Sequence, residues 1–328
     1  MNAAPRTGRE LIEATRPFSV ESRATSWFHL VSTFALLAAG TALAASPLPW
    51  LLRACFSVLD GLLAVRLFIL YHDHLHGSVL NGSWLARSLL YPISLWVMAP
   101  PNVWRETHNY HHAHTAKLVG SNIGSYAMMT TDQWAQATAA ERRRYKFIRH
   151  PATMLFGYFT AFMLEMGLLS FLRSPRKRWD SLVAVLLNWA VSALLWWRFG
   201  FAVFFFCHFL PVFVACAIGA YLFYAQHNYP DAFIQPREKW AYDRAALESS
   251  SYMEMGPVLH WFTGNIGYHH VHHLNPGIPF YRLPEAMAAI PELQAPGTTR
   301  LTVREIARCF QLKLWDPAQG RLVGYPRS

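Results

Sequence analysis

The chain has 328 residues, of which 53% are hydrophobic and only 15% are charged, and its formal net charge is +10. An average soluble protein carries about 25% charged residues, so this composition excludes an intrinsically disordered chain and a highly charged nucleic-acid-binding protein. It favours a protein of the lipid bilayer whose basic excess faces anionic headgroups, and no nucleic acid is expected as a partner.

Four apolar stretches predict transmembrane helices that come in two closely spaced pairs. They are residues 27–45, 50–70, 182–197 and 201–224. At 1.5 Å per residue the first stretch is about 28 Å long, which matches the hydrocarbon thickness of a bilayer. We therefore expect an all-α integral membrane protein with four transmembrane helices.

Three ionisable residues lie in the second of these stretches. We expect Arg53 to extend toward the membrane interface. Asp60 and Arg66 should face the interior of the helix bundle, because a charged side chain is costly in lipid.

A fifth apolar stretch, Met154 to Leu172, is not expected to cross the membrane. It contains Glu165 and runs into the basic segment 173–178, which the positive-inside rule places in the cytosol. Residues 84–100 contain Pro92 and run into the pair Pro100-Pro101, so they predict an interfacial or half-buried helix rather than a crossing. Four crossings then put both termini in the cytosol. We expect a single domain, residues 1–328, in the cell inner membrane, with residues 71–180 and 225–328 forming a cytosolic helical cap.

Three short windows hold 11 of the 16 histidines. The windows contain His72, His74 and His76, then His108, His111, His112 and His114, and finally His269, His270, His272 and His273. Histidines three or four positions apart lie on one face of a helix. Each window therefore presents two or three imidazoles in a narrow arc.

Eight of these imidazoles are too many for one metal ion and suit two ions with open positions. They are His72, His76, His108, His111, His112, His269, His272 and His273. Neutral imidazole binds Fe, Zn, Cu and Ni, and a structural zinc site needs only four ligands. Asp73 and Glu106 are the only carboxylates close to the windows, so the Glu-x-x-His pairs of soluble di-iron bundles are missing. The pattern predicts a dinuclear, all-histidine centre held in the cap.

The three windows resemble the histidine boxes of the membrane fatty acid desaturases. The matching segments are His72-Asp73-His74-Leu75-His76-Gly77, Arg105-Glu106-Thr107-His108-Asn109-Tyr110-His111-His112 and Gly264-Asn265-Ile266-Gly267-Tyr268-His269-His270-Val271-His272-His273-Leu274. The third continues into Ile278-Pro279-Phe280-Tyr281-Arg282-Leu283-Pro284-Glu285, which is similar to the bacterial acyl-lipid branch of the Δ12 or ω-6 type. The similarity extends from about Trp27 to Asp316.

The resemblance implies an enzyme that uses two iron ions and O₂ to desaturate a fatty acyl chain. It also implies a ninth histidine ligand, for which His227 is the candidate. The expected metal ligands are thus His72, His76, His108, His111, His112, His227, His269, His272 and His273. In the acyl-CoA branch an asparagine four residues before the ninth histidine helps to hold the site, and this chain has Phe223 there.

The other polar residues of the windows are assigned supporting positions. We expect His74, His114 and His270 to line the site rather than to bind metal. The acceptors for the second N–H of the ligands are expected among Asp73, Glu106, Asn265 and Asn275. The chain has no His-Pro-Gly-Gly motif of a fused cytochrome b5. The electron donor, a ferredoxin or a cytochrome b5-like protein, is therefore expected to be a separate partner.

Two other functions remain open at this stage. The same di-iron site could act as a fatty acyl hydroxylase, an acetylenase or an oxidative decarboxylase, and the histidine boxes do not distinguish these outcomes. A histidine-rich membrane metal transporter is a remote alternative, because it would need ligands along the spans rather than at their ends. The position of the new double bond and the carrier of the acyl chain do not follow from the boxes.

Overall fold

Four long apolar helices form two hairpins that carry the rest of the fold. The computed structural model describes residues 4–118 and 125–326. The first hairpin is α2 (Arg23–Ala45) and α3 (Trp50–His76); the second is α10 (Trp179–Phe199) and a 25-residue helix, Phe201–Ala225. That last helix comprises α11 (Phe201–Phe204), a π-helical turn (Phe205–Phe209) and α12 (Leu210–Ala225). All four are long and apolar enough to cross a membrane, which confirms the four predicted spans.

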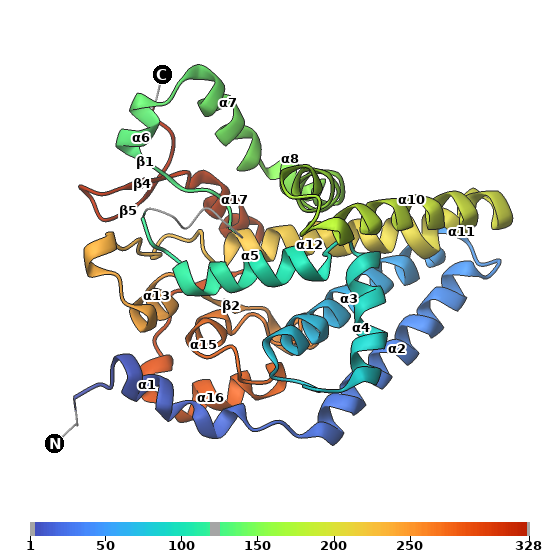
Figure 1. Cartoon of the computed structure of the whole chain (residues 1–328), viewed down its shortest axis with the longest axis horizontal. Coiled ribbons are helices and arrows are strands. Elements are labelled where there is room, and N and C mark those ends of the chain that lie inside the picture. Colours follow the sequence, from blue (N-terminus) through green and yellow to red (C-terminus); the bar gives the residue numbers. More distant parts are fainter. Residues whose placement is uncertain (1–3, 119–124, 327–328) are drawn as a thin grey trace.

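The hairpin turns and the chain termini lie at opposite ends of the molecule. In Figure 1 the α2–α3 and α10–α11 turns are on the right, and both termini are on the left. Large apolar side chains are exposed along the hairpins; Trp197 is 82% and Phe28 is 66% exposed. Exposed apolar surface of this extent marks a face that contacts lipid.

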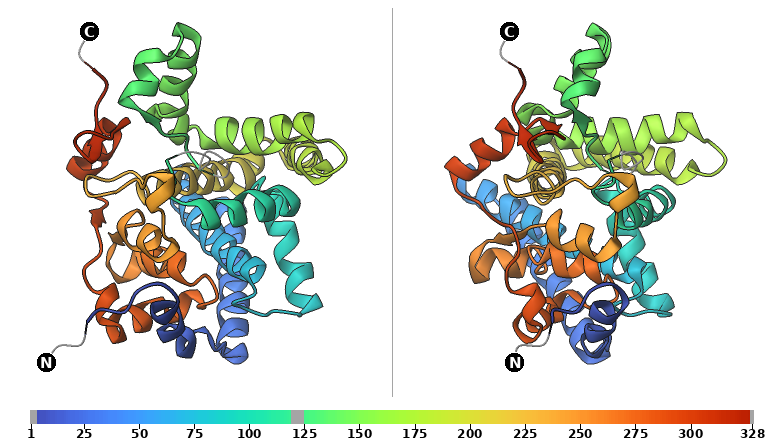
Figure 2. Two further views of the ribbon diagram at one scale, coloured as in Figure 1. Left: turned by 60° about the vertical axis from the view of Figure 1, so that its left-hand side comes forward. Right: turned by 90° about the vertical axis from the view of Figure 1, so that its left-hand side faces the viewer.

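Shorter elements form the cap between the hairpins and the termini. The α-helices are α1 (Gly8–Ala14), α4 (Trp84–Trp96), α5 (Pro101–His114), α6 (Thr131–Gln136), α7 (Ala139–Ile148), α8 (Pro151–Leu155), α9 (Ser170–Arg173), α13 (Tyr242–Glu248), α14 (Gly256–Phe262), α15 (His269–Leu274), α16 (Leu283–Ala289) and α17 (Val303–Gln311). Single 3-10 turns occur at Arg16–Ser19, Arg237–Lys239, Phe280–Arg282 and Pro291–Leu293. The views in Figure 2 also place the N-terminal segment beside the α13–α16 region.

Five short strands supplement the helices and were not predicted from the sequence. β1 (Met129–Thr130) pairs in parallel with β4 (Leu314–Asp316), which pairs antiparallel with β5 (Arg321–Val323). β2 (Tyr252–Glu254) pairs in parallel with β3 (Thr298–Arg300). With at most three residues each, these strands tie loops together, and the fold remains mostly helical.

Two segments that were not predicted to cross the membrane form helices shorter than the four spans. Residues 158–169 form a π-helix between α8 and α9, and it packs on α10 and α12. It is not one of the four helices long enough to span a membrane in the described part of the chain. α4 has 13 residues and is likewise too short to cross. One face of α4 buries Leu90 and Ile93, and the other exposes Trp84 at 76%, as an interfacial helix requires.

α3 is the central helix of the bundle and extends beyond its predicted end. It packs against both α2 and α12, and its apolar window is the most buried of the four. The helix continues past Leu70 to His76 and stops at Gly77, whose φ of 77° provides a left-handed cap. The first histidine window is therefore the final part of a buried helix.

The three ionisable residues of the predicted second span, Arg53, Asp60 and Arg66, are buried in α3. Asp60 is 0% exposed and accepts a hydrogen bond from Thr41 Oγ1 (2.9 Å), and Arg66 is 2% exposed. Both face the interior, as predicted. Arg53 is 8% exposed, and its Nε donates to the Ala44 carbonyl in the last turn of α2 (2.7 Å). This bond satisfies one of the carbonyls that the end of α2 leaves without a helical partner.

The crossing of α3 and α12 depends on a glycine. A Cβ at Gly61 would lie 2.7 Å from Val214 Cβ and 3.0 Å from the Pro211 carbonyl oxygen. These distances are below van der Waals contact, so any side chain at this position would push the two helices apart.

We predict that Gly61→Ala destabilises the protein by about 1–3 kcal/mol relative to Gly219→Ala, because only the first substitution overpacks a helix contact. At Gly219 the nearest atom to a new Cβ is Phe162 Cζ at 3.6 Å, an ordinary contact. Both changes carry the same gain in helix propensity. Thermal unfolding of the detergent-purified variants measures the difference. Equal midpoints would show that the helices do not meet at Gly61.

Candidate metal centre

Three separate elements and one loop bring the histidine side chains together. The first window ends α3, the second lies on α5, the third forms most of α15, and His227 follows α12. α5 begins at a proline pair and is tied to the start of α10, because Asp180 accepts from the Asn102 N–H (2.8 Å) and Glu106 pairs with Arg178 (3.1 Å). The approach of the loop before α15 to α3 needs Gly264, whose Cβ would meet Ile69 Cγ2 at 2.8 Å.

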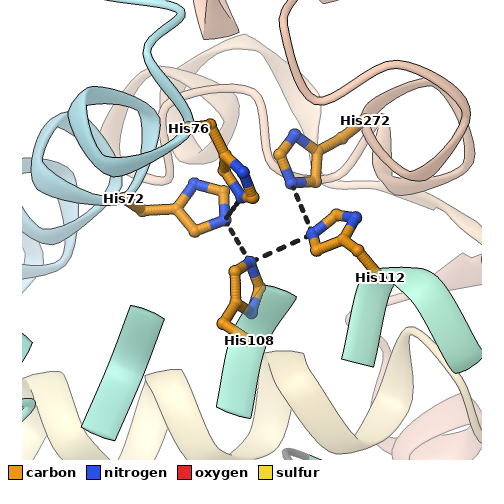
Figure 3. Close-up of side chains that lie close together, drawn as sticks. All are labelled: His72, His76, His108, His112 and His272. Carbon is orange, nitrogen blue, oxygen red and sulfur yellow. Dashed lines mark hydrogen bonds between the residues drawn. The ribbon is translucent and has the colours of Figure 1, made fainter. Parts of the chain in front are cut away.

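Five imidazoles, which we call the five-histidine group, converge from α3, α5 and α15 (Figure 3). The group consists of His72, His76, His108, His112 and His272, with ligand atoms within 4.8 Å of one another. The Nε2–Nε2 distance is 2.8 Å from His72 to His108 and 3.0 Å from His108 to His112. Two further Nε2–Nε2 distances are 3.3 Å, from His76 to His72, and 3.2 Å, from His272 to His112.

A second set, the four-histidine group, lies next to the first. It consists of His111, His227, His269 and His273, again within 4.8 Å. The His227 Nε2 atom is 3.1 Å from His111 Nε2 and 2.9 Å from His269 Nε2, and His273 is 3.1 Å from His269. The two groups touch where the rings of His112 and His273 stack, with centroids 4.2 Å apart.

The helical periodicity explains how one helix serves both groups. On α5, His108 and His112 are four residues apart and share the five-histidine group, while His111 turns to the other group. On α15 the pair His269 and His273 enters the four-histidine group, and His272 turns away. Adjacent positions on a helix point about 100° apart, so each helix divides its imidazoles between two centres.

Burial keeps the imidazoles of the cap uncharged. It lowers the pKa of His227 to about 4 and lowers the pKa values of His108, His112, His269 and His272 well below 6.5. The same cause lowers the pKa values of His111 and His273. A neutral imidazole carries one proton and one lone pair. The cluster therefore offers lone pairs at neutral pH.

The hydrogen bonds of two histidines show that the cluster fits a cation. The Nδ1 of His72 donates to Asp73 Oδ1 (2.9 Å), and the Nδ1 of His227 donates to the Ser249 carbonyl (2.9 Å). Each Nε2 is then a bare acceptor that faces two more ring nitrogens within 3.3 Å. Lone pairs aimed at one space are stabilised by a metal ion there, and all-imidazole sites suit transition metals.

Of the four residues predicted to accept the second ring N–H of a clustered histidine, only Asp73 accepts such a bond. Asp73 receives the His72 N–H and also the Phe280 backbone N–H (2.8 Å), so it connects α3 to the segment after the third box. Glu106 pairs with Arg178 instead, and the amides of Asn265 and Asn275 donate to other groups. These three assignments are wrong because the side chains bond to other partners.

Two acceptors were not found from the sequence. One is the Ser249 carbonyl, and the other is Thr115 Oγ1, which lies 3.3 Å from His273 Nδ1. Thr115 donates its own proton to the His111 carbonyl (2.7 Å), which leaves its oxygen as an acceptor. A backbone carbonyl carries no sequence signal, and only the position of Thr115 next to the second box could have suggested it.

The remaining clustered histidines lie outside both groups, as expected. His74 Nδ1, His114 Nδ1 and His270 Nε2 bond to the carbonyls of Val79 (3.1 Å), Tyr110 (2.9 Å) and Leu293 (3.1 Å). The ring of Phe223 lies beside the four-histidine group, 5.0 Å from His111 and 6.1 Å from His227 between centroids. Phe223 offers no ligand atom at this position.

Comparison with known proteins gives a consistent result. A family model described as "Fatty acid desaturase" matches residues 48–304. A fatty acid desaturase of Bacillus subtilis (strain 168) is 29% identical over 281 residues, which cover 84% of this chain and 78% of the relative. An sn-1 oleoyl-lipid 12-desaturase of Synechocystis sp. (strain ATCC 27184 / PCC 6803 / Kazusa) is 23% identical, with 90% and 85% covered. An sn-1 acyl-lipid omega-3 desaturase (ferredoxin) of Nostoc sp. (strain 36) is 24% identical, with 74% and 68% covered.

We predict that His227→Ala lowers the metal content of the purified protein from about two ions per chain to about one, because only the four-histidine group loses a ligand. His114→Ala is the matched control and should retain both ions, since its imidazole bonds to a backbone carbonyl. Elemental analysis by mass spectrometry measures the content. Equal metal loss in the two variants would contradict the grouping.

A second prediction concerns the pH dependence of the protein after chelation. A histidine that is neutral when folded binds protons more readily when unfolded, so its stabilising contribution is complete above pH 6.5 and declines below it, toward pH 4 for His227. The unfolding temperature of the metal-free protein should therefore decrease as the pH is lowered from about 7.5 to about 5.5. The slope should be shallower in His227→Asn. A midpoint that is constant over this range would show that the imidazoles are not buried.

Proposed function

Because the chain belongs to the fatty acid desaturase family, whose members are oxidoreductases, we propose that it inserts a carbon–carbon double bond into a fatty acyl chain with O₂ as the oxidant. The observation that carries this proposal is the convergence of nine histidines into two adjoining groups. The proposed metal ligands are these nine residues, five for one ion and four for the other.

The chemistry needs a metal centre because the substrate methylene groups are unactivated. No side-chain base can remove a proton from such a carbon. Two bound iron ions would supply the O₂-dependent hydrogen abstraction that no side chain provides. The donor set suits iron, since imidazole is among its usual ligands and every ligand here is an imidazole.

The electron balance of the desaturation reaction requires an external electron donor. Reduction of O₂ to two water molecules takes four electrons and four protons. The acyl chain supplies two electrons and two protons as two hydrogen atoms leave neighbouring carbons and the double bond forms. The other two electrons come from an external donor, and two protons come from water. We propose a separate ferredoxin or cytochrome b5-like protein as that donor, and the Nostoc relative carries ferredoxin in its name.

The surrounding side chains hold the imidazoles and keep the site dry. Asp73 keeps the proton of His72 on Nδ1, which fixes the tautomer and the ring orientation. The indole of Trp104 stacks on His108, with centroids 4.8 Å apart, and Phe68 packs edge-on against Trp104 at 4.8 Å. These aromatic rings exclude water from one side of the five-histidine group.

We also propose the membrane orientation. The chain would act as one domain in the cell inner membrane, with four crossings and the metal centre on the cytosolic side. Both termini lie at the end opposite the hairpin turns (Figure 1), and the basic segment 173–178 lies directly before α10. Basic residues next to a span favour the cytosolic side.

The function is tested by expressing the protein, with iron and a competent electron donor, in a host that lacks polyunsaturated lipids. We expect new fatty acids whose mass is lower by two hydrogen atoms. His272→Ala should reduce this product below about 1% of wild type, because a ligand of the five-histidine group is lost. His114→Ala, at the edge of the second window, should leave the product unchanged.

The products also separate the alternatives. A gain of oxygen would indicate hydroxylation, a loss of carbon would indicate decarboxylation, and alkyne carbons in the NMR spectrum of the product would indicate a triple bond. Each of these would contradict the proposed desaturation, and so would an unchanged lipid profile.

A further inference from the structure

A cavity separate from both histidine groups lies between the start of α2, the middle of α3 and α14. Its volume is about 540 Å³, which is within the range of small-molecule sites. Its lining includes Arg66, His29, Tyr252, His260, Trp261 and Tyr281. A guanidinium, two imidazoles and three phenols, the third from Tyr268, contribute polar groups to a wall that lies in a bundle of apolar helices.

Arg66 is a buried cation that no acidic side chain neutralises. Its Nε donates to Thr33 Oγ1 (3.2 Å), its Nη1 donates to the Trp261 carbonyl, and its Nη2 lies 3.0 Å from His29 Nδ1. No carboxylate pairs with it among the described residues of the chain. A buried guanidinium without a carboxylate partner retains a positive charge that a bound anion would neutralise.

Glu254, the acidic residue of the cavity wall, does not fill this position. Its carboxylate is bound by Arg300 at 2.7 Å, and the side chain is 49% exposed. Glu254 therefore leaves the charge of Arg66 without a carboxylate partner, and the buried Arg66 side chain is part of the cavity lining. The indole of Trp261, 4.1 Å from the guanidinium carbon, and the ring of Phe280 at 5.4 Å hold the guanidinium in place from two sides.

The cavity lies toward the end of the bundle at which α2 begins and α3 ends. Arg66 precedes the cytosolic end of α3 at His76 by ten residues, about 15 Å of helix. His29 is in the second turn of α2, at the same end of the bundle. On α14, Val258 is 67% and Trp261 is 36% exposed. Exposed apolar and indole groups beside a polar cavity are typical of the membrane interface.

A short chain of contacts leads from the cavity to the five-histidine group. Phe280 lines the cavity, and its backbone N–H donates to Asp73 Oδ2 (2.8 Å). The other oxygen of Asp73 accepts from His72 (2.9 Å). A molecule anchored in the cavity therefore lies close to the residues that hold the metal centre.

We propose that this cavity binds the phosphate of a membrane phospholipid, which pairs with Arg66 and accepts hydrogen bonds from the hydroxyl and imidazole groups of the wall. A neutral sugar headgroup would leave the buried cation unpaired, whereas a phosphate neutralises it and accepts several hydrogen bonds. The identification of the bound lipid as the acyl substrate rests on the proposed function. The binding of a phospholipid phosphate in the cavity does not depend on that function.

The test is a lipid titration of the detergent-purified protein, followed by native mass spectrometry. Wild-type protein should bind dioleoylphosphatidylglycerol at least about tenfold more tightly than dioleoylglycerol, which has the same acyl chains and no phosphate. Arg66→Gln should abolish this preference, and Arg66→Lys should retain part of it. The matched control is Arg53→Gln, which removes another buried arginine of α3 at the opposite end of the helix.

Three results would overturn the inference. They are an unchanged preference in Arg66→Gln, equal binding of the two lipids by wild-type protein, and complete displacement of the lipid by inorganic phosphate alone. The last would assign the cavity to a free anion. If Arg66→Gln does not fold, the wild-type lipid comparison and Arg66→Lys still decide the question. No turnover is measured, so a failure of the proposed desaturation leaves this result in force.

Discussion

The packing of nine imidazoles, seven buried and two half-buried, into two adjoining groups is the constraint on which the structure depends. Their nitrogen atoms come from α3, α5, α15 and the turn after α12, so no single element can form the centre. Desolvation keeps the rings uncharged, and hydrogen bonds such as those of His72 and His227 fix which nitrogen holds the proton. Lone pairs are thereby concentrated in two small volumes, an arrangement that a cation stabilises.

The scaffold can be understood as the means of meeting that constraint. α3 packs tightly on α12 at Gly61 and ends at His76, so the first two imidazoles are placed by a rigid helix. α5 is anchored to α10 through Asp180. Asp73 supports His72 and simultaneously the segment that follows α15. A substitution at any of these points would move ligands that it does not touch.

Much of this was predictable from the sequence, since its signals are local. Apolar runs of about 20 residues predict spans, and histidines four positions apart predict a shared face. The division into five and four was not predicted, because it depends on which side of α5 and of α15 faces α3. The acceptor at Ser249 and the cavity around Arg66 are likewise products of tertiary packing. Glu106 was misassigned because the sequence does not show that Arg178 lies beside it.

The central claim is that nine histidines bind two metal ions, five histidines at one ion and four at the other. Iron K-edge X-ray absorption of the iron-loaded protein tests this claim most directly. The account predicts a first shell of nitrogen and oxygen without sulfur, and outer-shell scattering from about four to five imidazoles per iron. Sulfur in the first shell, or two or fewer imidazoles per iron, would contradict it.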